Sequence, residues 1–159
     1  MGPKYKDAPP PQKDFALIYL LRGDVEYGGG YKTKFEINDR VVTALYDDGY
    51  SWLYLKPGLY DIEAANREIK LNIEAGETYY VKFYQNVTFE PAYNKYSSEN
   101  ILKRYQINDI RKELNNARLS DAIPYEKAPL SIDRKFRNSE ESSLAKFRIG
   151  EVRSQVLPD

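Results

Sequence analysis

The 159-residue chain contains neither cysteine nor histidine. It therefore lacks the commonest ligands for zinc, copper and iron, and the side chain most used for proton transfer near neutral pH. Disulfide bonds are excluded too, and a chain without cysteine gives no sign of whether its compartment is oxidising or reducing. From these absences we expect a protein that is not an enzyme and that binds no cofactor and no metal.

Net charge and long apolar runs are also missing. Lysine and arginine number 24, as do aspartate and glutamate, so no global field attracts nucleic acid or an anionic membrane surface. No apolar run approaches the roughly 20 residues of a membrane-spanning helix, and residues 1–7 lack the apolar core of a signal peptide. We expect a soluble chain without a nucleic-acid partner. A polar start of this kind also remains when a signal sequence has been cut away.

Two short patterns resemble ligand loops but lack the required spacing. The glycines at 28–30 precede Lys32, yet the phosphate-loop order of glycine, four residues, glycine, lysine and serine or threonine is absent. Asp47 and Asp48 precede a glycine, but the further acidic positions of an EF-hand loop are missing. Both patterns are interpreted as ordinary loop and turn chemistry.

Tyrosine, by contrast, is abundant: the chain has 15 tyrosines and one tryptophan. Aromatic enrichment favours strands, which predicts a mainly β protein. From residue 50 to 55 the side chains alternate, with Tyr50, Trp52 and Tyr54 on one face, as in a strand. Pro57 and Gly58 then supply turn geometry, so we predict a hairpin between residues 50–55 and 59–64.

Further strand patterns flank this stretch. Residues 15–21 are almost continuously apolar, which predicts a central strand covered on both faces. Alternating side chains and turn residues predict other strands at 32–38, 40–46, 68–74, 77–85 and 101–107. Turn signals every eight to ten residues or so are typical of a β-sandwich or a small barrel.

The sequence predicts one domain between two tails. Residues 1–14 contain three consecutive prolines and are interpreted as a flexible tether. Residues 15–119 form the sandwich domain, which ends in a short helix near 109–119 capped by Asn108; a longer helix from Glu99 is the alternative.

Residues 120–159 change in character, because isolated apolar side chains stand among prolines and mixed charges. Such a segment buries too little apolar area to fold alone. We predict an extended C-terminal tail, with room for one or two helical turns at 139–148, and we expect it to hold partner proteins.

The chain carries, in this order, Ala16-Leu17-Ile18-Tyr19-Leu20-Leu21-Arg22, Phe35-Glu36-Ile37-Asn38, Val42-Thr43-Ala44-Leu45, Gly49-Tyr50, Leu55-Lys56-Pro57-Gly58-Leu59-Tyr60 and Ala75-Gly76-Glu77-Thr78-Tyr79-Tyr80-Val81. The order of these motifs resembles a bacterial domain of unknown function that occurs in small outer-membrane lipoproteins and is related in pattern to the PEGA domain. The resemblance spans about residues 8–119. It implies an immunoglobulin-like or transthyretin-like β-sandwich without known catalysis, here of about seven or eight strands. It also implies a periplasmic protein whose precursor carries a lipidated cysteine, which this chain lacks.

Two non-catalytic functions are compatible with this pattern. The first is a structural subunit of an envelope assembly, such as a secretion complex, that binds other proteins through aromatic side chains and the tail. Its candidate protein-binding residues are Tyr80, Tyr84, Tyr93, Tyr96, Tyr125, Phe136 and Phe147. Tyr80 and Tyr84 fit equally well as packing residues of the sheet.

The second function is carbohydrate or peptidoglycan binding, with Trp52 as the stacking residue, although its position in a central strand favours burial in the core. An enzyme is the third possibility. It would need a serine or threonine nucleophile, for which no motif is present, or a pair of carboxylates brought together by the fold.

Overall fold

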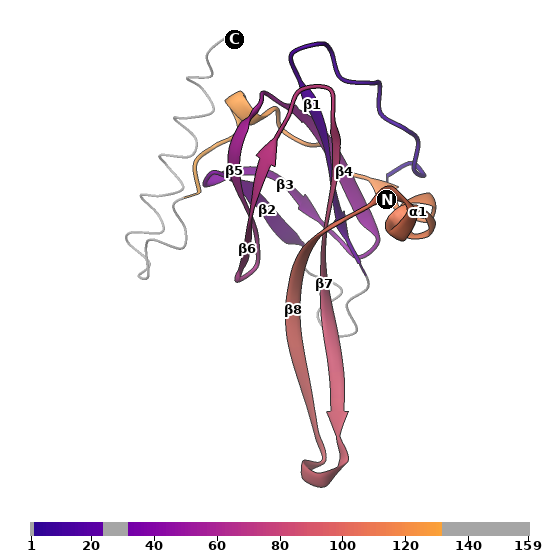
Figure 1. The fold of residues 1–159 in the computed structure, drawn as a ribbon. Coiled ribbons are helices and arrows are strands. Elements are labelled where there is room, and N and C mark those ends of the chain that lie inside the picture. Colours follow the sequence, from indigo (N-terminus) through magenta and orange to yellow (C-terminus); the bar gives the residue numbers. More distant parts are fainter. Residues whose placement is uncertain (1, 24–31, 132–159) are drawn as a thin grey trace.

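The computed structural model describes residues 2–23 and 32–131. Within them the chain forms two sheets, with strand orders β8-β7-β1-β4-β9 and β3-β2-β5-β6 (Figure 1). In the same residues, no helix is long and apolar enough to cross a membrane. The elements in chain order are β1 (Ala16–Arg22), β2 (Thr33–Ile37), β3 (Arg40–Leu45), β4 (Gly49–Leu55), β5 (Gly58–Ala64), β6 (Arg67–Ile73), β7 (Thr78–Glu90), η1 (Pro91–Tyr93), β8 (Lys95–Tyr105), α1 (Ile107–Asn115), β9 (Arg118–Leu119) and η2 (Tyr125–Lys127).

The main core lies between the two sheets and confirms the predicted β-sandwich. Strands such as β1, β4 and β7 send alternate side chains into this core, as a period of two requires. β1 pairs with β4 on one side and β7 on the other, and every residue in it is buried, as predicted for a central strand. The five-stranded sheet contributes Ile18, Leu20, Leu53, Leu55, Val81 and Phe83, and the four-stranded sheet contributes Phe35, Ile37, Val42, Leu45, Ile62 and Ile73.

The predicted hairpin at Pro57-Gly58 is wrong. β4 belongs to the five-stranded sheet, whereas β5 pairs with β2 and β6 in the four-stranded sheet. The turn therefore carries the chain from one layer to the other, and Leu55 and Ile62 meet in the core from opposite sheets. Turn residues specify a reversal of direction, but they do not specify whether the two strands pair.

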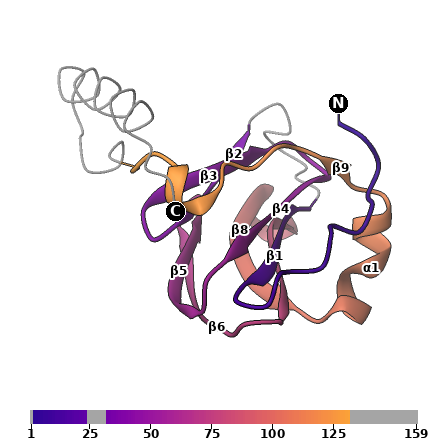
Figure 2. The ribbon, with the colours of Figure 1, turned by 90° about the horizontal axis from the view of Figure 1, so that it is seen from above.

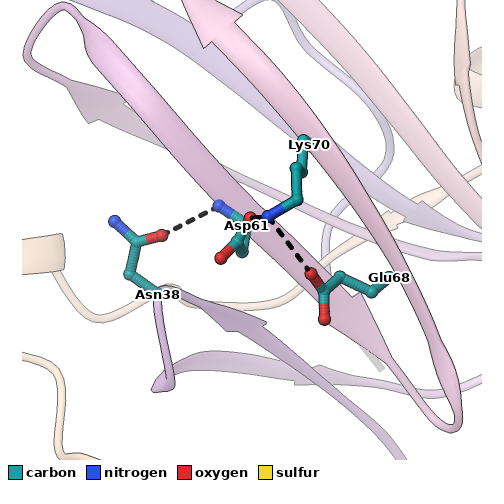
Figure 3. Close-up of polar contacts among 4 residues, drawn as sticks. All are labelled: Asn38, Asp61, Glu68 and Lys70. Atoms are coloured by element: carbon teal, nitrogen blue, oxygen red, sulfur yellow. Dashed lines mark hydrogen bonds and ion pairs between the residues drawn. The ribbon is translucent and has the colours of Figure 1, made fainter.

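The sequence predicts strands at 32–38 and 40–46 because Asn38-Asp39 is a turn pair, and the structure confirms that this turn joins β2 to β3. Both residues have positive φ, 48° and 63°, which suits a tight hairpin between twisted strands. Asn38 Oδ1 accepts a hydrogen bond of 2.8 Å from the backbone N–H of Asp61, so the turn is fixed to β5 (Figure 3). Lys70, the cross-strand neighbour of Asp61, lies 2.8 Å from its carboxylate and 3.8 Å from that of Glu68 (Figure 3).

A second, smaller core covers the outer face of the five-stranded sheet. Helix α1 packs here through Ile110 and Leu114, against Leu17, Tyr19 and Leu21 of β1. The helix begins at Ile107 with Gln106 as its N-cap, so the prediction of Asn108 as the cap was wrong. Its capping residue makes no side-chain hydrogen bond, and the buried apolar face is what holds it in place.

The N-terminal residues also lie on this outer face, beside α1 (Figure 2). The backbone of Lys4 forms an isolated antiparallel β-bridge with that of Arg118. The ring of Tyr5 packs between those of Tyr19 and Tyr50, with centroid distances of 6.0 and 5.2 Å. Ala8 N–H donates to the Tyr19 hydroxyl at 2.9 Å. These residues were interpreted as a flexible tether; instead they are docked, because a row of tyrosines binds their backbone.

Residues 120–131, predicted as the start of an extended tail, cross to the other sheet and cover the edge of β3. Ile123 N–H donates to Val42 O and Val41 N–H to Pro129 O, while Ala128 is buried in the main core. The proline-rich composition concealed this role, since an edge strand accepts partners without any sequence signature of its own. The helical turns predicted at 139–148 lie outside the described residues.

Candidate functional site

A long arm projects from the sandwich. β7 pairs with β1 as far as Phe83, and from Tyr84 to Glu90 its strand partner within the described residues is β8 (Figure 1). The sequence predicted strands at 77–85 and 101–107 and missed the outer half of this ribbon. Its residues, such as Asn86, Thr88 and Ser97, have no core face to impose an alternating pattern, so periodicity gave no signal there.

Three aromatic side chains gather at the far end of the arm. We call Phe89, Tyr93 and Tyr96 the aromatic tip; they are 45%, 77% and 59% exposed. The rings of Phe89 and Tyr96 face each other across the two strands with centroids 4.8 Å apart. Two of the predicted protein-binding residues, Tyr93 and Tyr96, are thus brought together, and the structure adds Phe89.

The tip is held by local hydrogen bonds. Asn94 takes a left-handed conformation with φ 46°, and its N–H donates to Pro91 O at 3.2 Å, which closes the turn. Behind the tip, the Ser97 hydroxyl donates to Glu90 Oε1 at 3.3 Å. A turn fixed in this way presents its aromatic rings with few conformations to lose on binding.

The base of the arm is braced against the sandwich. Arg67 Nε donates to Asn100 O at 2.7 Å, and the amide of Asn100 bridges Asn66 and Gln85 at 2.9 and 3.1 Å. These contacts join β8 to the turn after β5 and to β7. The direction of the arm is therefore set by the rigid sandwich and not by the arm alone.

Tyr80 and Tyr84 lie at this base and act as packing residues. The ring of Tyr80 stacks on that of Tyr19, at 5.1 Å and 7° between planes. Lys82 Nζ lies 4.7 Å from the Tyr84 ring centroid and 2.7 Å from Glu113 of α1. Both tyrosines are half-buried, so the structure favours the packing interpretation that the sequence left open.

The remaining predicted residues are not part of the tip. Tyr125, in η2, packs edge-on against Tyr60 with centroids 5.5 Å apart, and its hydroxyl accepts a hydrogen bond of 3.2 Å from Asn38. It anchors the segment that covers β3. Phe136 and Phe147 lie outside the described residues.

A cleft of about 640 Å³ opens beside Trp52, which the sequence had placed in the core. Trp52 is half-buried, and its ring meets that of Tyr54 at 66° with centroids 5.4 Å apart. The residues that line the cleft come from three parts of the chain: Ser51, Trp52, Leu53 and Tyr54 from β4, Pro9, Pro10, Gln12 and Phe15 from the N-terminal segment, and Leu119, Ser120, Asp121, Ala122, Pro124 and Glu126 from the segment after α1. No sequence signal marked it, because its walls come from both tails.

Two glutamates that are distant in sequence are neighbours in the four-stranded sheet. Glu36 of β2 and Glu63 of β5 are cross-strand partners, and both are largely buried on the sheet's outer face. Neither lines the cleft beside Trp52. Within the described residues, no three acidic side chains gather closely enough to hold a metal ion.

The comparisons with known proteins place the chain without assigning an activity. A model of the family described as "Protein of unknown function (DUF2846)" matches residues 12–95, from the segment before β1 to the first residue of β8. Neither the curated proteins nor the solved structures include a significant match. As the match covers more than half of the sequence, the protein belongs to the DUF2846 family.

Proposed function

We propose that this protein is a non-catalytic structural subunit that binds other proteins of a bacterial envelope assembly, such as a secretion complex. The observation that carries the proposal is the braced arm with its aromatic tip. Phe89, Tyr93 and Tyr96 leave large apolar areas in contact with water, and burial of this area in an interface is favourable. Large aromatic residues of this kind dominate binding energy at protein interfaces.

The shape of the arm supports a protein partner. A two-stranded ribbon that extends beyond its sheet has little stability of its own. Because the outer half of the arm adds little to the stability of the fold, we assign it a role in binding. The tip is narrow, and it fits a concave pocket better than a flat surface. The rings of Phe89 and Tyr96 are neighbours, so a single apolar pocket in a partner can cover both.

The location belongs to the same proposal. We propose that the protein lies in the periplasm and that a lipid on its full precursor anchors it to the outer membrane. The support for this location is the order of motifs, which resembles that of PEGA-like outer-membrane lipoproteins. Partners also bind the segment after residue 131. The docked residues 4–9 then hold the sandwich close to the anchoring surface, with the arm available to neighbours.

The decisive experiment compares two matched double variants in cells that make this protein. Tyr93→Ser with Tyr96→Ser removes two rings of the tip, and Tyr46→Ser with Leu59→Ser removes exposed apolar groups, 51% and 66% exposed, from the sandwich. After chemical cross-linking and purification, we expect the tip variant to lose its cross-linked partners while the sandwich variant keeps them. Circular dichroism checks that both fold.

Two further results complete the test. A chain that ends at Ser131 keeps every described contact, so loss of partners in it assigns binding to the tail. If the tip variant retains all cross-linked partners, the aromatic tip is not an interaction surface and the proposal fails at its central observation.

A further inference from the structure

The cleft beside Trp52 contains an open strand edge. β9 pairs with β4 at Gly49 and Tyr50, and the last bond of this edge runs from Ser120 N–H to Tyr50 O, 2.8 Å. The chain then turns away, since the Thr43 hydroxyl donates to Asp121 O and Ile123 pairs with Val42 of the other sheet. Beyond Tyr50 the edge of β4 is left without a strand.

The backbone of Trp52 and Tyr54 points toward this opening. Along a strand, the N–H and C=O groups of every second residue point to the same side. Because those of Tyr50 point to β9, those of Trp52 and Tyr54 point to the same edge, and the residues between them face β1. In the described part of the chain, no backbone group pairs with Trp52 or Tyr54 on that side.

The chemistry of the walls selects the kind of ligand. Asp121 and Glu126 line the cleft, no lysine or arginine does, and within the described residues neither carboxylate forms an ion pair. The rings of Trp52 and Tyr54 provide an apolar surface that also attracts cations. A basic ligand with apolar side chains is complementary to both features.

We propose that this cleft binds an extended peptide segment of a partner protein, which pairs as an additional strand with the open edge of β4. Its lysine or arginine side chains face Asp121 and Glu126, and its apolar side chains pack on Trp52 and Tyr54. Strand addition of this kind draws affinity from the backbone and specificity from alternate side chains. The site is separate from the aromatic tip, so it stands or falls independently of the proposed function.

The test uses the purified full chain, in which Trp52 is the single tryptophan and reports directly on the cleft. The probe is a blocked peptide of about six alternating lysines and valines, which at roughly 3.3 Å per residue covers the open edge. We expect a saturable change in tryptophan emission at up to millimolar peptide, weakened by salt. The Tyr93→Ser/Tyr96→Ser variant should respond equally.

Three other ligands separate the contributions of charge and of backbone pairing, and test for a glycan ligand. A peptide of alternating glutamates and valines should bind about tenfold more weakly or worse, because it faces two carboxylates. The lysine–valine peptide with alternate amides N-methylated should lose about tenfold in affinity, because it cannot complete the strand pairing. The tetramer of N-acetylglucosamine, which represents a glycan ligand, should leave the emission unchanged.

Matched protein variants test the charge. Asp121→Asn with Glu126→Gln should weaken the basic peptide roughly fivefold, as expected for two solvated ion pairs, whereas Glu74→Gln with Glu77→Gln should have no effect. The proposal is overturned if no peptide changes the emission, if the acidic or N-methylated peptide binds as well as the basic one, or if the glycan binds instead.

Discussion

The hydroxyl of Tyr54 donates a hydrogen bond of 2.7 Å to the carbonyl oxygen of Pro9, and so joins strand β4 to a segment 45 residues earlier in the chain. Tyr19 and Tyr50 accept bonds from the same segment at Ala8 and Lys6. A proline-rich stretch has few N–H groups of its own, so the tyrosine hydroxyls bind the backbone groups that remain.

Tyr54→Phe removes this bond while keeping the ring. We expect the N-terminal segment to detach more often, with the amide of Ala8 exchanging its hydrogen about fivefold faster, as the loss of roughly 1 kcal/mol implies. Nuclear magnetic resonance can measure this rate. Tyr46→Phe, on an exposed ring, is the control and should leave the rate unchanged. Equal exchange in all three proteins would show that Tyr54 does not hold the segment.

Ala65 is strained in the turn between β5 and β6. Its φ is 53°, in the left-handed region that is unfavourable for alanine by about 1–2 kcal/mol, and its side chain is exposed. Ala65→Gly should therefore raise the free energy of unfolding by about 0.5–1 kcal/mol, measured by urea denaturation, after the entropy of the unfolded glycine is counted.

The neighbouring residue gives the matched control for this change. Ala64 lies in β5 and is 1% exposed, so Ala64→Gly should lower the free energy of unfolding by about 1 kcal/mol. If both substitutions shift stability in the same direction, the turn does not have the described conformation.

Buried and half-buried tyrosines make the fold sensitive to alkali. Burial raises the pKa of Tyr50, which is 1% exposed, and that of Tyr80, because their charged forms would lose hydration. A raised pKa in the folded state means stability that is complete below the unfolded value of about 10 and is lost as pH rises above it.

We expect the urea midpoint to be flat through neutral pH and to fall above about pH 10. The absorbance of ionised tyrosine should rise together with unfolding. In Tyr50→Phe the fall should be shallower, because one buried group no longer ionises. A stability that stays constant well above pH 10 in the unchanged protein would contradict the burial of these hydroxyls.

Much of the fold could be predicted from local chemistry. β1 was evident from its continuous apolar run, and the inward faces of β6 and β7 from alternation around Leu71 and Val81. The turn at Asn38-Asp39 followed from the two residues that best tolerate positive φ. In each case the signal lies within a few residues, where side-chain period or backbone preference acts directly.

The candidate sites were harder to predict from the sequence. Tyr93 and Tyr96 were named as contact residues, but nothing in their spacing showed that a ribbon would carry them beyond the core. The cleft was missed altogether, because Pro9, Trp52 and Asp121 are brought together by the docking of both tails. Contacts between such distant segments leave no periodic pattern in any one of them.

The sequence by itself determined which residues form strands and which side chains of each strand are apolar, because these properties depend on neighbours along the chain. Tertiary structure alone decided that Pro57-Gly58 joins two sheets, that residues 4–9 and 120–131 cover the sandwich, and that the edge of β4 stays open. These outcomes depend on which surfaces compete for burial and for backbone hydrogen bonds, and that competition is settled only when the whole chain has packed.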